Sequence, residues 1–196
     1  MRGAALPMPM AMLAVMLAGV MPVSGQERAP EQVPLFNAQG YRASHYRSPT
    51  RQPPEGVTRI APAAAAQLRP GRDALFIDVT PATGGVRQAD GRWRLAETRW
   101  SIPGAHWFPE SGRGDPDPAI EAGFLAGVAR LSGGRRDRPL VLFCLADCWM
   151  SWNAARRLRA QGYRQVWWMA QGSDGWRDLG LALAPASPEG GVVAGP

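Results

Sequence analysis

The apolar run Leu140 to Phe143 constrains the fold more than any other stretch of the chain. Four consecutive apolar residues entered from a proline are typical of a short strand buried on both faces, as in a parallel sheet. Cys144 ends this strand. After a loop without periodicity, Ser151 is the expected N-cap of a helix that ends near Gly162. This order directs unpaired backbone N–H groups at the cysteine sulfur and predicts an anion-binding loop around a nucleophile.

The remaining apolar segments alternate between strand and helix patterns. An open, mostly parallel α/β sheet with helices on both faces is the architecture that this alternation predicts. Asp90-Gly91 is expected to close a two-residue hairpin. Further strands are expected at Val57–Ile60, Asp73–Val79 and Gln165–Met169, and in the short apolar stretch that follows the Pro-Gly turn within Ile102–Pro109. Helices are expected at Ala63–Leu68 and from Asp117-Pro118 to Gly133.

The two ends of the chain differ from its middle. Residues 1–25 have one charge, a short apolar stretch and small residues near Gly25, which is typical of a cleaved secretory signal peptide. Residues 26–56 are polar and rich in proline and are expected to form an extended arm, 57–183 a single domain, and 184–196 a flexible tail. We therefore expect an exported, periplasmic protein with no membrane span after signal cleavage.

Charge narrows the classes of partner. The formal net charge is +6, and every basic residue is an arginine. The arginines are scattered and accompany no nucleic-acid motif, so small anions are better candidate partners than nucleic acid.

Both cysteines lie in one short segment, at 144 and 148. Two cysteines in an exported protein usually form a disulfide, but a ring this small would stabilise the fold by only about 2 kcal/mol. Two thiols without nearby histidines do not complete a zinc site, so no metal is expected. A pair of reacting thiols and a bridged pair both remain open.

Two other polar residues lie where strands are predicted. Asp78 falls at the end of a strand, where a carboxylate either serves a site or caps neighbouring backbone N–H groups. His106 lies inside an apolar stretch, where a histidine is more often a satisfied buried or edge group than a catalytic one.

The landmarks of the chain, in order, resemble those of a rhodanese-like domain. They are IDV ending at Asp78, IPGA from Ile102, LVLFC ending at Cys144, NAARRL, QGY, and GSDGW ending at Trp176. The resemblance covers roughly Val57 to Leu183 and implies a persulfide on Cys144, held by loop N–H groups. The usual rhodanese loop has a glycine and an arginine, whereas this chain has LADCWM, in which Asp147 would oppose a thiolate.

The Cys-Trp signature followed by MSWNAARR, with the leader and the Tyr-Arg pairs of the arm, resembles more specifically an exported family. That family is named for PQQ-dependent catabolism and a CXXCW motif, although here three residues separate Cys144 from Cys148. The resemblance implies a place beside quinoprotein alcohol oxidation in the periplasm. No cofactor is expected to be required, and PQQ association is implied only by the resemblance.

Two hypotheses follow. In the first, Cys144 is the nucleophile and Cys148 the resolving partner of an enzyme with sulfurtransferase-like or thiol-disulfide redox activity, acting on a small thiol or sulfur compound. In the second, the domain is an accessory module in which tryptophans form an aromatic rim for a quinone or a quinoprotein dehydrogenase. The candidate binding residues are Asp147, Trp149, Met150, Ser151, Trp152, Asp78 and His106.

Overall fold

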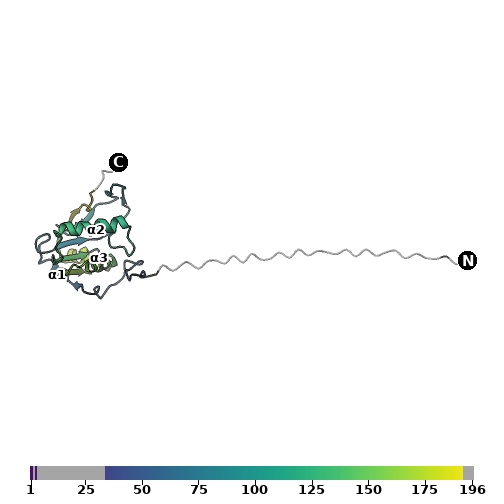
Figure 1. Cartoon of the computed structure of the whole chain (residues 1–196), viewed down its shortest axis with the longest axis horizontal. Helices are drawn as coiled ribbons and strands as arrows, with labels where there is room; N and C mark the ends of the chain where they lie inside the picture. Colours follow the sequence, from purple (N-terminus) through teal and green to yellow (C-terminus); the bar gives the residue numbers. More distant parts are fainter. Residues whose placement is uncertain (2, 4–33, 192–196) are drawn as a thin grey trace. The chain divides into compact units, whose positions relative to one another are not determined.

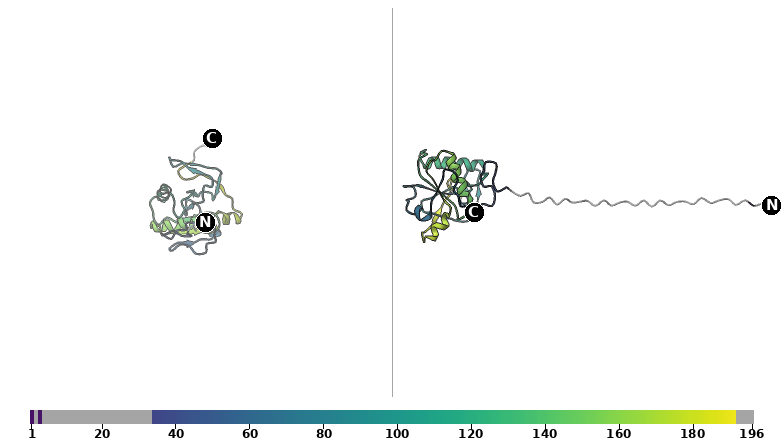
Figure 2. Two further views of the ribbon diagram at one scale, coloured as in Figure 1. Left: turned by 90° about the vertical axis from the view of Figure 1, so that its right-hand side faces the viewer. Right: turned by 90° about the horizontal axis from the view of Figure 1, so that it is seen from below.

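The computed structural model describes residues 1, 3 and 34–191. The predicted signal peptide, the first part of the predicted arm and the last five residues of the chain therefore lie outside the described residues, except for Met1 and Gly3. The helices, strands and connections of residues 34–191 can be followed in Figures 1 and 2.

A five-stranded sheet forms the centre of the domain. All of its strand pairs are parallel, and the order is β1-β8-β7-β2-β6, so that β7 is the middle strand. The strands are β1 (Thr58–Arg59), β2 (Leu75–Asp78), β6 (His106–Trp107), β7 (Leu140–Phe143) and β8 (Val166–Met169). The strand predicted at residues 140–143 is confirmed at both ends.

Helices cover both faces of this sheet. They are α1 (Pro62–Ala65), α2 (Pro118–Leu131), α3 (Trp149–Ala160) and α4 (Gly172–Asp178). Leu140 and Leu142 of β7 pack with residues of α2 and α3, whereas Val141 and Phe143 pack with residues of α1 and α4. The alternation within one strand shows that both faces are buried, and the predicted α/β class is confirmed.

Helix α2 begins where the sequence indicates. The Asp117 carboxylate accepts hydrogen bonds from the backbone N–H groups of Ala119, at 2.7 Å, and Ile120, at 3.4 Å. Phe124 and Val128 are fully buried, and the helix gives way to two glycines with positive φ at 133 and 134. The helix therefore packs on the sheet through the face that carries Phe124 and Val128.

Helix α3 begins three residues earlier than predicted. Its first residue is Trp149 and its N-cap residue is Cys148, so the assignment of Ser151 as N-cap is wrong. Ser151 is fully buried, and its hydroxyl donates to the Cys148 carbonyl at 3.1 Å and accepts from Trp168 Nε1 at 3.0 Å. The Ser151 hydroxyl therefore bonds to the backbone three residues before it and does not cap the N-terminus of α3.

Two small antiparallel sheets complete the domain. The predicted hairpin is present as β3 (Val86–Arg87) and β4 (Trp93–Arg94), but Gln88 N–H donates to the Arg92 carbonyl and leaves a three-residue loop instead of two. Gly91 takes the positive φ, 88°, that such a loop needs. Residues Ala184–Ala186, where the sequence predicts a flexible tail, form β9 instead, because they pair with β5 (Arg99–Ser101).

Candidate functional site

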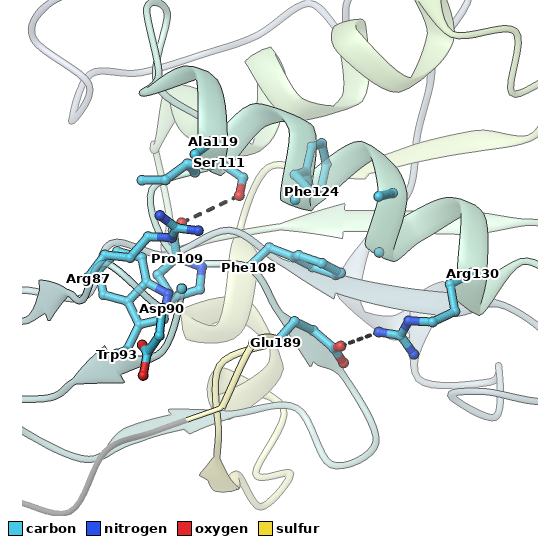
Figure 3. Close-up of a pocket in the computed structure, with 16 residues that line it drawn as sticks. Arg87, Asp90, Trp93, Phe108, Pro109, Ser111, Ala119, Phe124, Arg130 and Glu189 are labelled. Atoms are coloured by element: carbon cyan, nitrogen blue, oxygen red, sulfur yellow. Dashed lines mark hydrogen bonds and ion pairs between the residues drawn. The ribbon is translucent and has the colours of Figure 1, made fainter.

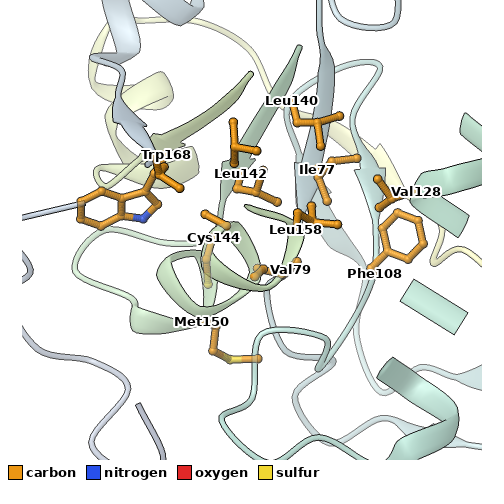
Figure 4. Packing of buried hydrophobic residues seen from close by; sticks show 14 of the residues in the cluster. Ile77, Val79, Phe108, Val128, Leu140, Leu142, Cys144, Met150, Leu158 and Trp168 are labelled. Atoms are coloured by element: carbon orange, nitrogen blue, oxygen red, sulfur yellow. The ribbon is translucent and has the colours of Figure 1, made fainter. Parts of the chain in front are cut away.

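Cys144 and Cys148, called the thiol pair below, lie at the carboxyl end of the middle strand. Cys144 directly follows β7, and Cys148 precedes the first residue of α3. Both are free thiols, and the Cys144 thiol donates to Cys148 Sγ across 2.8 Å. Cys144 is 0% exposed and Cys148 3%. Figure 4 shows Cys144 among the apolar side chains of the sheet, with Met150 nearby.

The loop between the cysteines is tightly held. Asp147 adopts a φ of 52°, which a short polar side chain tolerates better than most non-glycine residues. The Ala146 N–H donates to the Asp174 carboxylate at 2.9 Å, and the Cys144 carbonyl accepts from Ser173 N–H at 2.8 Å. A Cβ on Gly172, whose φ is 56°, would collide with that carbonyl. The start of α4 therefore fixes the loop from one side.

Residues 34–56, called the arm below, hold the loop from the other side. Arg47 forms an isolated antiparallel bridge with Cys148. Ser48 N–H donates to the Asp147 carbonyl, and Trp149 N–H donates to the Tyr46 carbonyl, both at 2.8 Å. The second bond satisfies an N–H that would otherwise be free at the start of α3. The arm thus lies directly on the loop that carries Cys148.

A buried asparagine fastens the arm to α3. The Asn153 side chain accepts from Arg42 N–H and donates to the Arg42 carbonyl, each at 2.9 Å. It also donates to the Gly112 carbonyl at 2.9 Å. All three hydrogen bonds are buried, so the Asn153 side chain connects α3, the arm and the segment at Gly112, which are distant in the sequence.

The predicted aromatic rim is occupied by the protein itself. Trp149 and Trp152 have ring centroids 5.2 Å apart, and Phe36 of the arm packs edge-on against Trp149 at 5.5 Å. The Arg42 guanidinium lies 5.0 Å from the Trp149 centroid. Trp149 Nε1 is buried and has no hydrogen-bond partner among the residues that the structure describes. The arm therefore covers part of the surface of these two half-buried rings.

The environments of the two thiols differ. Burial raises the pKa of Cys144 well above its ordinary value, and its hydrogen bond to Cys148 and the nearby charge of Asp78 act in the same direction. The pKa of Cys148 is lowered, first by the hydrogen bond from Cys144 and then, against its burial, by the Met150 N–H and the charge of Arg47. The negative charge of the pair is therefore held best on Cys148.

Asp78 lies behind the thiol pair in a closed network. Its buried carboxylate accepts from Thr80 N–H at 2.9 Å, Thr80 hydroxyl at 2.6 Å and Ser101 hydroxyl at 2.6 Å. Arg99 completes the set at 2.8 Å. Of the two roles left open by the sequence, the capping of a backbone N–H is present, and the carboxylate also acts on Cys144 through its charge.

His106 has a different neighbourhood. Its Nδ1 lies 2.8 Å from Glu189 Oε1, and Arg130 binds the other oxygen of that carboxylate at 2.6 Å. His106 lies on the edge strand β6 of the sheet. Its described contact holds Glu189 against the domain and does not involve the thiol pair. Met150 and Ser151, by contrast, are buried next to Cys148 in the first turn of α3.

Two cavities in the described part of the domain bear on the site. Figure 3 shows the larger, about 380 Å³, between the β3–β4 hairpin, α2 and Glu189, and it contains neither cysteine. The second, about 250 Å³, is lined by Thr80 and Leu145, with Arg99 and Arg177 among its other walls. The Thr80 hydroxyl also favours a thiolate at Cys144. The second cavity is therefore the one next to the thiol pair.

Several functional contacts could not be recognised in the sequence. Arg42, Asn153 and Arg99 act at this site through partners far along the chain. The repeated Tyr-Arg pairs of the arm were a visible signal, but they do not reveal which helix the arm contacts. Within residues 1, 3 and 34–191, no helix is long and apolar enough to cross a bilayer, and no three potential metal ligands gather.

The middle strand, its terminal cysteine and the following helix define an open α/β domain that presents a thiol at the carboxyl edge of a parallel sheet. The rhodanese-like domain matches residues 61–179, and the chain belongs to this family. A solved structure of a polysulfide-sulfur transferase homodimer from Wolinella succinogenes is 18% identical, with a TM-score of 0.43, over 66% of this chain and 79% of that one. No curated protein matches the chain.

Proposed function

We propose that this rhodanese-like protein works in the periplasm in association with PQQ-dependent (quinoprotein) alcohol catabolism, and that its thiol pair takes up sulfane sulfur and reduces it. The observation that carries the chemistry is the contact of two buried free thiols, 2.8 Å apart, at the start of α3. The place in catabolism is supported by the resemblance of the Cys-Trp signature and the arm to the CXXCW family.

The reaction uses both cysteines. One thiolate attacks the outer sulfur of a small persulfide, R–S–SH, and becomes a protein persulfide while R–SH leaves. The second cysteine then attacks the sulfur of the first, so that a disulfide forms and hydrogen sulfide leaves. The two thiols supply two electrons and two protons, and the sulfane sulfur becomes sulfide. A dithiol reductant of the thioredoxin class restores the pair.

The second cavity supports an anionic donor. Arg99 and Arg177 lie in its walls beside Leu145, which follows Cys144 directly. Both guanidiniums already have carboxylate partners, Asp78 and Asp174, so the charge that remains for a donor is modest. We therefore propose a small persulfide or thiol compound as the substrate class.

A single-turnover experiment tests this function. Reduced mature protein is mixed with glutathione persulfide, and sulfide, protein thiols and protein mass are followed together. The expected result is about one sulfide released per disulfide formed, as the reaction's stoichiometry requires, with neither product from Cys144→Ser or Cys148→Ser. Oxidation of the pair without sulfide release would refute the sulfur step, and intact thiols after mixing would refute both.

A second candidate function is the accessory module for a quinone or a quinoprotein dehydrogenase. The observation that favours it is the buried Trp149 Nε1, a donor without a described partner beside Trp152 and Arg42. Titration with PQQ tests it, because binding at micromolar concentration should quench tryptophan fluorescence and be weakened by Trp149→Phe. An unchanged spectrum counts against this candidate and leaves the thiol chemistry untouched.

A further inference from the structure

We infer that Cys148, and not Cys144, makes the first attack, and that Arg47 of the arm is the residue that supplies its counter-charge. This inference rests on the proposed thiol chemistry. It goes beyond the rhodanese-like loop itself, because it assigns a functional side chain to a segment that precedes the matched domain.

The backbone register places the two side chains together. Arg47 and Cys148 are opposite each other in an antiparallel bridge, and their neighbours make the hydrogen bonds, Ser48 to Asp147 and Trp149 to Tyr46. In such a non-hydrogen-bonded pair, the side chains leave the same face with Cβ atoms about 4.5–5.5 Å apart. The guanidinium of Arg47 is therefore attached next to the sulfur of Cys148.

Arg47 is also free to serve this role. Its side chain is exposed, and within the described residues it forms no ion pair. Arg42, the other arm arginine nearby, is buried and donates to the Ser44 and His45 carbonyls while it lies over Trp149. Only one of these two arginines has an uncommitted charge.

The helix contributes in the same place. Cys148 is the N-cap residue of the 12-residue helix α3, and the Met150 N–H of the first turn favours a thiolate on its sulfur. Cys144 has the opposite surroundings, because it is fully buried and the Asp78 carboxylate, although paired with Arg99, acts on it from β2. The exposed carboxylate of Asp147 is the one acidic neighbour of Cys148 in the loop.

These surroundings give the pair an order of reaction. Cys148 carries the negative charge and attacks the outer sulfur of the donor, while Cys144 keeps its proton and its hydrogen bond to Cys148. When the Cys148 persulfide has formed, Cys144 loses its proton to the departing sulfide and closes the disulfide. The electron and proton balance is that of the proposed function, with Cys148 as the first cysteine to attack and Cys144 as the second.

The ionisation of each cysteine can be followed separately in the intact reduced protein by NMR with ¹³Cβ-labelled cysteine. The Cys148 signal is expected to titrate at lower pH than that of Cys144. In Arg47→Gln, the thiolate-to-thiol ratio of Cys148 at a fixed pH should fall roughly three- to tenfold, and Arg47→Lys should restore it. The difference should shrink at about 1 M salt, where the Debye length is about 3 Å.

Arg51→Gln is the matched control, because Arg51 is an exposed arm arginine without a described side-chain partner. Earlier titration of Cys144, or equal effects of Arg47→Gln and Arg51→Gln, would overturn the inference. The titration needs no sulfur donor, so it distinguishes the two proposals. If the donor experiment fails while Arg47→Gln alone shifts Cys148, the charge assignment stands and the sulfur reaction does not.

Discussion

Replacement of Asn153 by alanine should release the arm and expose the thiol pair. The change removes three buried hydrogen bonds, two to the Arg42 backbone and one to the Gly112 carbonyl. The two bonds to Arg42 hold the arm, and at a net of about 0.5–1.5 kcal/mol each their loss should weaken the arm's docking by about 1–3 kcal/mol. Because 1.4 kcal/mol is a factor of ten, the population with the arm lifted should rise about 5- to 150-fold.

The assay is the labelling rate of the two thiols by an aromatic disulfide reagent, measured beside urea unfolding. Cys144 and Cys148 are 0% and 3% exposed, so labelling of the folded protein has to wait for an opening. The exposed arm amide Gln39 supplies a control, Gln39→Ala, which should label at the parent rate. If Asn153→Ala labels faster only in proportion to its loss of global stability, the arm does not gate the thiols, and the reasoning fails.

Three further outcomes are expected. Asp78→Ala leaves the nearly buried Arg99 without its carboxylate and should lower the free energy of unfolding by about 3–5 kcal/mol. The control Asp73→Ala removes an exposed ion pair and should change the free energy of unfolding little. Equal urea midpoints for the two variants would contradict this expectation. In α2, a Cβ at Gly127 would collide with Phe108, whereas a Cβ at Gly123 would meet no atom. Gly127→Ala should therefore destabilise the protein by about 1–3 kcal/mol, and Gly123→Ala should stabilise it by about 0.5–1 kcal/mol. Thermal unfolding of both variants checks the two signs. Because the pKa of Cys144 is raised, this thiol keeps its proton in the folded state at a pH where the unfolded thiol has lost it. The contribution of Cys144 to the free energy of unfolding is therefore constant below the unfolded pKa, and reduced Cys148→Ser should lose up to about 1.4 kcal/mol of stability per pH unit above about pH 8.5. A variant with both cysteines replaced should not show this loss.

The strands and the start of α2 were predictable because the residues that specify each of them are adjacent in the sequence. Four apolar residues at 140–143 can only be buried on both faces, and Asp117-Pro118 marks a helix start by the chemistry of the first turn. The start of α3 was not predictable in this way. Its first N–H is satisfied by the Tyr46 carbonyl, about a hundred residues away in the sequence, and this contact lets the helix begin at Trp149 without the expected serine cap.

The candidate site was predictable in its centre and not in its surroundings. Cys144 and Cys148 were identified from their position after a buried strand, and their contact follows from a short loop. The arm's role was missed because a proline-rich segment without periodicity carries no signal of where it docks. For His106, the residue type suggested catalysis, but the structure pairs its ring with Glu189. This pairing could not be predicted, because Glu189 lies in residues 184–196, which the sequence indicates to be a flexible tail.

The fastening of the arm by Asn153 has a consequence for the order of folding. Arg42 and Asn153 are 111 residues apart, so their hydrogen bonds close a loop that contains nearly the whole sheet. Contacts of such long range are costly in chain entropy until the intervening residues are ordered. We therefore expect the arm to dock last, although it is synthesised first. Until then the two cysteines are close and uncovered, so the conditions during maturation decide whether the arm closes over a dithiol or over a disulfide.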